Sequence, residues 1–123
     1  MKYLVLMYAD PAATEAMTAA ERAEVLRRHE ALHQDLEGTG EMLNGAGLAF
    51  PRDTKTIRWQ GEGMPPTTTE GPLTDTTDHL TAYYVIDCAT PERAREIAER
   101  VLDFHVVAVE VRPVHDSFGM GQT

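Results

Sequence analysis

Two segments of the sequence carry apolar residues at consecutive positions, and they constrain the fold more than any other feature. Residues 3–8 read YLVLMY and residues 82–86 read AYYVI, a composition typical of β-strands. A strand with one face in water alternates apolar and polar residues, because successive side chains point to opposite faces. Neither segment alternates in this way. We therefore expect both faces of the sheet that contains them to be covered.

Helix signals lie between the strand-like segments. Thr18 and Glu21 have the spacing of a capping box, in which the two side chains satisfy free N–H groups at a helix start. This pair predicts a helix that runs to about Leu36. Thr90 followed by Pro91 predicts the start of a second helix, because proline is favoured at the first helical position.

The elements are expected in the order strand, helix, strand, strand, strand, helix, strand. Besides the two apolar segments, the expected strands lie within residues 41–50, 55–60 and 106–114, with a hairpin loop at 61–66. This order predicts an α+β fold, a ferredoxin-like sandwich with an antiparallel sheet and two helices on one face. We expect one domain over residues 1–114 and a flexible C-terminal tail over residues 115–123.

Two helices on one face leave the other face of the sheet open. At about 25 cal/mol per Å² of apolar surface, a wet face would cost several kcal/mol, which is comparable with the stability of a small domain. A second copy packed sheet against sheet covers that face, and two-fold dimers are the commonest closed assemblies. The sequence therefore predicts a homodimer.

Charge and composition exclude some partners. The formal net charge is −9 at pH 7, from 11 basic and 20 acidic residues, which argues against nucleic acid and anionic membranes. No apolar run reaches the ~20 residues that a membrane helix needs. We interpret residues 3–8 as a strand, not as part of a signal peptide, and expect a cytoplasmic protein. The single cysteine, Cys88, permits no internal disulfide, which agrees with that location.

His29 is the first candidate for chemistry. It shares one helical face with Val25, Leu32 and Leu36, so its imidazole is expected to point toward the sheet. Two interpretations stay open: a core histidine with a hydrogen-bond partner, or a general base. His33, four residues later, would allow a metal pair, but the glutamate of a zinc-protease helix is absent, and we expect no metal here.

The segment EGPLTDTTDHLTAYYVID, residues 70–87, places acids and threonines directly before an apolar strand. It is either a solvated loop that keeps an edge soluble or the wall of a small-molecule site. Arg112, near the end of the last strand, is a candidate anchor for a substrate carboxylate. Alternatively, Arg112 pairs with Glu110 or Glu92.

Three motifs in this order resemble the YCII-related family, in the branch named for an Asp-Gly-Pro-Phe motif. They are MKYLVLMY at the start, EGPLTDT before the aromatic strand and VEVRPV near the end, so the resemblance reaches about Val114. The family is similar in fold to the dimeric α+β barrels. The family's Asp and Phe are Glu70 and Leu73 here, and a lysine often found shortly afterwards is Thr77. A carboxylate is kept, but the aromatic side chain is lost.

The resemblance implies a role in small-molecule catabolism with a His-Asp acid-base pair. The matching positions are His29 as base and Asp10 as its partner, and Glu70, Asp75 and Thr76 as substrate-binding residues. It implies a cofactor-free lyase, isomerase or dehydrohalogenase that acts on a small acidic or cyclic metabolite.

Two other functions stay open. One is a non-catalytic binding or regulatory protein, because genes of this branch often lie beside those of alternative sigma factors. The other is an oxygenase, with or without haem, by analogy with other dimeric barrels alone.

Overall fold

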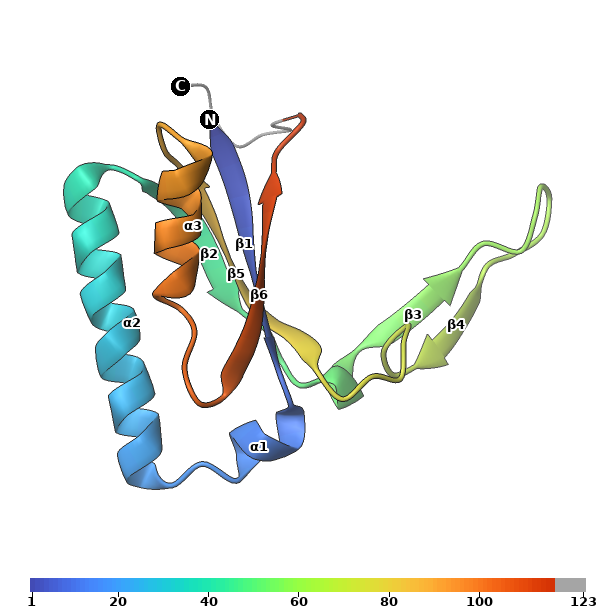
Figure 1. Cartoon of the computed structure of the whole chain (residues 1–123). Helices are drawn as coiled ribbons and strands as arrows, with labels where there is room; N and C mark the ends of the chain where they lie inside the picture. The colour runs from blue at the N-terminus through green and yellow to red at the C-terminus, as the bar shows by residue number, and fades with distance from the viewer. Residues whose placement is uncertain (117–123) are drawn as a thin grey trace.

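A ferredoxin-like α+β sandwich is confirmed in the computed structural model, which describes residues 1–116 (Figure 1). The elements are β1 (Lys2–Ala9), α1 (Pro11–Glu15), α2 (Ala19–Thr39), β2 (Met42–Gly47), η1 (Pro51–Asp53), β3 (Lys55–Arg58), β4 (Thr67–Glu70), β5 (His79–Asp87), α3 (Pro91–Glu99) and β6 (Val106–Pro113). Most of the predicted tail, from residue 117 onward, lies outside the described residues.

The main sheet has the strand order β2-β5-β1-β6, and all three of its pairings are antiparallel. Helices α2 and α3 lie on one face of it (Figure 1). Strands β3 and β4 form a separate two-stranded sheet that extends away on the other side. The expected hairpin loop is confirmed between β3 and β4, whereas β4 and the short α1 were not predicted.

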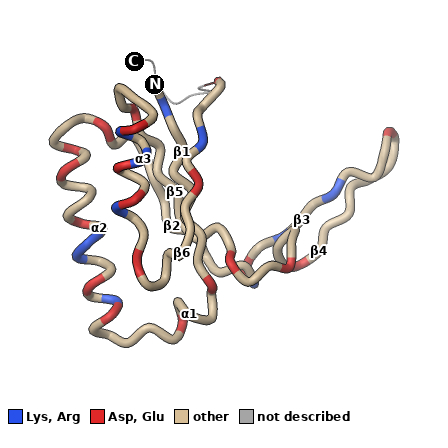
Figure 2. Tube along the Cα trace, viewed as in Figure 1, with Lys and Arg blue, Asp and Glu red and all other residues tan. Residues whose placement is uncertain are grey.

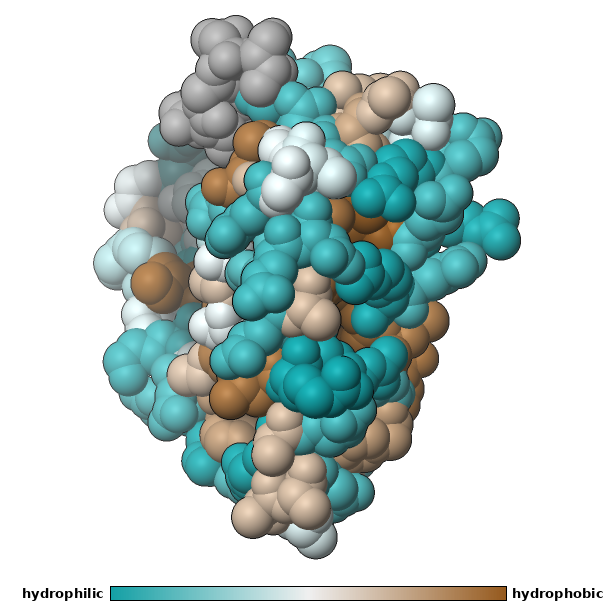
Figure 3. All heavy atoms as spheres, turned by 90° about the vertical axis from the view of Figure 1, so that its left-hand side faces the viewer, coloured by the Kyte–Doolittle hydropathy of each residue, from teal (hydrophilic) through white to brown (hydrophobic). Residues whose placement is uncertain are grey.

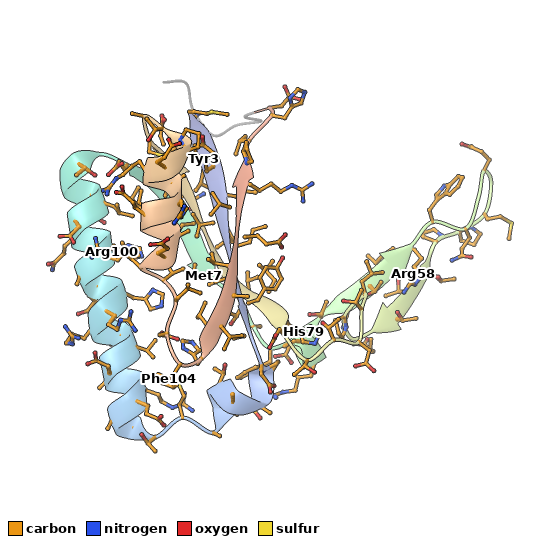
Figure 4. The ribbon with its side chains drawn as sticks, viewed as in Figure 1. Tyr3, Met7, Arg58, His79, Arg100 and Phe104 are labelled. Atoms are coloured by element: carbon orange, nitrogen blue, oxygen red, sulfur yellow. The ribbon has the colours of Figure 1, made fainter. Side chains whose placement is uncertain are left out.

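The core lies between the sheet and the two long helices. Val5 and Met7 of β1 and Ile86 of β5 are fully buried against Leu36 of α2 and Ile97 of α3. Figure 4 shows Met7 on this side of β1. The outer surface of the α2 side is mostly hydrophilic (Figure 3), and acidic and basic residues are interspersed along both helices (Figure 2). The helices therefore cover one face of the sheet and present a polar surface to water.

Among the described residues, no helix lies over the opposite face of the sheet (Figure 1). Strand alternation puts Leu4, Leu6 and Tyr8 on this face of β1, because their neighbours in the strand belong to the core. Tyr83 and Val85 of β5 pair with Leu6 and Leu4 and lie on the same face. We call this surface the open sheet face. The four side chains of β1 and β5 named last are apolar or aromatic, as the non-alternating sequences predict, and Leu4, Leu6 and Tyr83 are partly buried while Val85 is buried. On β6 the exposed Glu110 and Arg112 lie opposite Leu6 and Leu4.

Local capping signals are confirmed. The Thr18 hydroxyl accepts a hydrogen bond from the Glu21 N–H at 3.1 Å, and the Glu21 carboxylate accepts one from the Thr18 N–H at 2.9 Å. Helix α2 ends at Gly40, whose φ of 78° is a conformation that glycine adopts without strain. The helix is therefore 21 residues long, slightly longer than predicted. No helix in the described part of the chain is long and apolar enough to cross a membrane.

The burial pattern of α2 gives a stability prediction. Leu36→Ala is expected to lower the free energy of unfolding by about 2–5 kcal/mol, because it leaves a cavity in the core. The matched control is Leu26→Ala on the same helix, where the side chain is exposed, and the expected change is within about 0.5 kcal/mol. Urea unfolding followed by circular dichroism measures both. Equal losses in the two variants would contradict this packing.

Candidate functional site

A hollow of about 610 Å³ lies where the main sheet meets the root of the β3–β4 hairpin. His79, the first residue of β5, marks this junction in Figure 4. The lining includes Tyr8, Pro72, Thr74, Thr76, Asp78 and His79. Part of the segment that the sequence offered as loop or wall thus lines a hollow of the size that small ligands occupy.

Tyr8 is the best-positioned donor in this hollow. Its hydroxyl donates a hydrogen bond to Glu110 Oε1 on the neighbouring strand β6. This hydrogen bond, followed by partial burial and the charge of Glu110, raises the pKa of Tyr8 above its usual value, although Arg112 acts in the opposite direction. The phenol therefore stays protonated at neutral pH, and its one proton is donated to Glu110.

Arg112 is an exposed cation on β6, and it lies outside the lining of the hollow. It lies two residues after Glu110 on β6, opposite Leu4 of β1, and strand alternation puts it on the open sheet face. Neither alternative partner is used, because no ion pair within 4.0 Å joins Arg112 to Glu110 or Glu92 among the described residues. Its guanidinium therefore has its five donors available for an anion.

Of the other predicted substrate-binding residues, one lines the hollow and two do not. Thr76 lines the hollow, and its hydroxyl donates to the Asp78 carbonyl oxygen at 2.9 Å. Glu70 instead pairs with Lys55 across the hairpin, with a closest distance of 3.2 Å, and both side chains are exposed. Asp75 is exposed and lies outside the lining of the hollow.

A second polar cluster lies on the helix side of the sheet. Tyr84 of β5 places its hydroxyl 2.8 Å from His29 Nδ1 and 3.1 Å from His33 Nε2. Gly45 on β2 allows this arrangement, because a Cβ built there would lie 2.5 Å from Tyr84 Cδ1. A phenol has one proton, so one imidazole accepts it and the other donates its N–H to the phenol oxygen. The three rings therefore form a coupled hydrogen-bonded chain.

Burial controls the charge state of this cluster. It lowers the pKa of His29 below its ordinary 6.5, while the negative charge of Asp103 partly opposes the shift. Burial also raises the pKa of Tyr84. Both groups are therefore held in their neutral forms. His29 is the histidine predicted to point toward the sheet, and its partner is a tyrosine.

The carboxylate whose charge opposes the lowering of the His29 pKa by burial is that of Asp103. The predicted partner, Asp10, makes its hydrogen bond to another part of the chain. Asp103 accepts hydrogen bonds from His105 N, His105 Nδ1 and Val106 N at 2.7–2.8 Å. Burial pushes the pKa of Asp103 upward, but these backbone hydrogen bonds and the charge of His105 bring it below its usual value. Asp10 caps α1 by accepting from Ala12 N at 3.0 Å, and no hydrogen bond joins it to His29.

Little space is open beside His29. On its inner side, a void of about 10 Å³ near Arg28 and Asp103 has room for about one water molecule. On its outer side, a shallow depression of about 410 Å³ runs along α2 past Leu26, His33 and Glu37. A ligand would reach His29 only from this outer surface. No group of three or more side chains suited to hold a metal ion occurs among residues 1–116.

Sequence reasoning missed Tyr8, Tyr84 and Asp103. Tyr84 carried a usable signal, because it lies in the centre of an apolar strand that an i, i+4 histidine pair was expected to face. Tyr8 and Asp103 carried no such signal. Tyr8 contacts Glu110, and Asp103 lies near His29, only because the fold brings distant parts of the sequence together.

The protein belongs to the α+β class, with an antiparallel ferredoxin-like sandwich. One face of its sheet is open, and a hollow lies at one end. A model of the YCII-related domain matches residues 1–116, and the chain belongs to that family. It is also 29% identical over 117 residues to an uncharacterized protein, R00369, of Rhizobium meliloti strain 1021, covering 93% of this chain and 92% of that relative. Membership in the Asp-Gly-Pro-Phe branch stays a prediction.

The shared phenol gives a second stability prediction. Tyr84→Phe is expected to cost about 1–3 kcal/mol of unfolding free energy, because two partly buried imidazoles lose a hydrogen-bond partner. The matched control is Tyr83→Phe, one residue earlier on the opposite face, where no hydrogen bond is removed; its expected effect is within about 0.5 kcal/mol. Urea titration measures both variants. A neutral Tyr84→Phe would show that the cluster contributes nothing to the fold.

The lowered pKa of His29 predicts the direction of a pH effect. Above pH 6.5 the imidazole is neutral in both states, and its full contribution to stability is present. As the pH falls below 6.5 the unfolded state takes up the proton first, so stability decreases until the lower folded pKa is passed. His29→Gln should reduce this decrease between pH 7.5 and 5.5, whereas His115→Gln, at an exposed position, should not. An NMR titration that gives His29 a pKa at or above 6.5 would contradict the expected direction.

Proposed function

We propose that this chain binds a small acidic or cyclic metabolite in the hollow beside Tyr8 and His79 and acts on it by cofactor-free acid-base catalysis, as lyases and isomerases do. The observation that carries the proposal is the convergence of an imidazole, a phenol and hydroxyl groups on one hollow of about 610 Å³. A few convergent polar groups in a hollow of this size are the usual feature of a ligand site.

The roles follow from the chemistry of each side chain. His79 is the proposed general base, because a neutral imidazole nitrogen accepts a proton from a substrate carbon or hydroxyl within hydrogen-bond reach. Tyr8 is the proposed donor to the developing oxyanion, because its raised pKa keeps the phenol protonated. A substrate oxygen would compete with Glu110 for this proton. Thr76 supplies a further hydroxyl in the wall.

Arg112 is the proposed anchor for an acidic group of the substrate. Its guanidinium has no ion-pair partner among the described residues, and its charge already acts on Tyr8. An arginine binds a carboxylate through two parallel hydrogen bonds, which fixes orientation as well as position. An acidic substrate held by Arg112 would therefore present a fixed side to the hollow.

The His29–Asp10 pair remains a second candidate centre. It depends on the family positions, and the specific observation in its favour is the hydrogen-bonded chain of His29, Tyr84 and His33, which offers a proton path. The absence of a deep hollow beside His29 makes it the weaker of the two sites.

A homodimer formed through the open sheet face is part of this proposal. Leu4, Leu6, Tyr83 and Val85 make the centre of that face apolar, and no helix of residues 1–116 covers it. A second copy would cover this surface and narrow the mouth of the hollow at its edge. We also place the chain in the Asp-Gly-Pro-Phe branch and in the cytoplasm, in agreement with its motif and its single cysteine.

Binding and turnover can be tested together with fixed probes: benzoate, succinate and a five-membered lactone carboxylate. Arg112→Ala is expected to weaken binding of an acidic probe about 10- to 100-fold, the loss of one charge-assisted contact. Benzoate and succinate test binding alone, whereas the lactone also has acidic protons next to its carbonyl group. His79→Ala should slow the exchange of these protons of the bound lactone for deuterium by about 10²- to 10⁴-fold. Titration calorimetry measures binding, and proton NMR in D₂O measures exchange. His115→Ala is the matched histidine control, since that side chain is almost fully exposed.

Different outcomes assign the function differently. If His29→Ala abolishes exchange with an unchanged melting temperature while His79→Ala does not, the centre lies on α2. If probes bind through Arg112 but no variant or wild type exchanges protons, the chain is a binding protein without catalysis. If no acidic or cyclic probe binds, the proposed substrate class is wrong.

A further inference from the structure

The hairpin of β3 and β4 with its loop, residues 55–70, is the least buried part of the described chain, and we call it the arm. Every residue from 57 to 70 is exposed apart from Gly61, which is partly buried. The arm extends away from the sandwich on the side of the sheet opposite to the helices (Figure 1). A two-stranded hairpin alone is marginally stable in water, because it has no layer to pack against. Within one copy, the arm lacks that layer.

Two large apolar side chains are exposed on the arm. Alternation along β3 puts Ile57 on the face opposite to Thr56 and Arg58, and Trp59 is the first residue after the strand. Ile57 is 68% exposed, and Trp59, the single tryptophan of the sequence, is 77% exposed. Tryptophan is enriched in the centres of protein interfaces, where its large ring is removed from water. Together these two side chains have the composition of a contact surface, which we call the Ile57 and Trp59 face.

The charges on this face are already satisfied. Lys55 shares the face with Ile57, and it forms an ion pair with Glu70 on the partner strand β4. No unpaired charge on this face attracts an oppositely charged partner. An apolar surface is the expected counterpart. The arm extends on the side of the sheet where a second copy would stack, so it would lie alongside that copy (Figure 1).

The apolar area of the arm also favours a second copy. One tryptophan buries about 150–250 Å² when its ring is removed from water. A standard interface buries about 800 Å² on each partner. Trp59 alone would therefore supply roughly a quarter of that area, in addition to what the sheet faces bury.

We propose that each arm packs its Ile57 and Trp59 face onto a second copy of this chain, outside the open sheet faces that stack at the centre. Two-fold symmetry then makes both contacts identical. The arm is rooted in the hollow, whose lining includes Asp53 and Thr54 before β3 and Pro72 and Thr74 after β4. A second copy that holds the arm also fixes this wall of the hollow. The inference rests on the proposed dimer and adds the arm as the part that completes the site.

Sedimentation equilibrium from 0.1 to 100 μM, together with Trp59 fluorescence over the same range, tests the arm directly. Wild type is expected to dimerise, with Trp59 emission moving to shorter wavelength as dimer forms. Ile57→Ser and Trp59→Ser should each raise the dimer dissociation constant at least 10-fold. Arg58→Ser, between them on the opposite face of the same strand, should change it less than 3-fold. Trp59 lies beyond the last β3–β4 pair, so its replacement leaves hairpin pairing intact.

Leu6→Asp on the open sheet face separates the two parts of the interface. If Leu6→Asp dissociates the dimer and Ile57→Ser does not, the sheet-to-sheet dimer holds and the arm proposal is overturned. If Ile57→Ser dissociates it and Leu6→Asp does not, the arm binds a second copy without sheet stacking, and the proposed dimer is wrong. A wild-type monomer at 100 μM, or a dimer in which Trp59 emits as a fully solvated indole, overturns the arm proposal.

Discussion

The structure depends on one constraint: β1 carries apolar side chains on both of its faces. Val5 and Met7 point to the helices and are fully buried, which fixes α2 and α3 on that side. Leu4 and Leu6 point the other way, where residues 1–116 provide no helix layer. Because β1 lies in the middle of the sheet, with β5 and β6 beside it, neither face can be hidden by moving the strand to an edge. The helix layer covers one apolar face of β1, and the proposed dimer would cover the other.

Local signals were sufficient for most elements of the fold. The capping box at Thr18 and the cap at Thr90 are local hydrogen-bond patterns, so the sequence contains all that decides them. Helix α1 was missed because its cap, Asp10, looked like the end of a strand, and its five residues are too few for a periodic signal. Strand β4 was missed because a run of threonines has no apolar alternation, and its pairing with β3 is what makes it a strand.

The candidate site was less predictable, because its contacts join distant parts of the chain. The orientation of His29 followed from helical spacing, but its partner Tyr84 is 55 residues away and is fixed by the pairing of β5 with β1. The family resemblance gave Asp10 the role of acidic partner, and in the structure its carboxylate caps α1. Residues 70–87 were interpreted as either a solvated loop or the wall of a site. In the fold, Thr76 and His79 line the hollow and Asp75 does not.

The acidic charge of the chain limits how a dimer can form. Each copy carries a net charge of −9, so two copies repel one another at long range unless the contact surface is nearly free of unpaired acids. On the arm, Glu70 is paired with Lys55. On the open sheet face, Glu110 lies opposite Leu6, and its carboxylate accepts a hydrogen bond from the Tyr8 hydroxyl. Tyr8 belongs both to the lining of the hollow and to this face. In the proposed dimer, a ligand that took the Tyr8 hydrogen bond would therefore change the charge that Glu110 presents to the second copy, which would couple ligand binding to dimer formation.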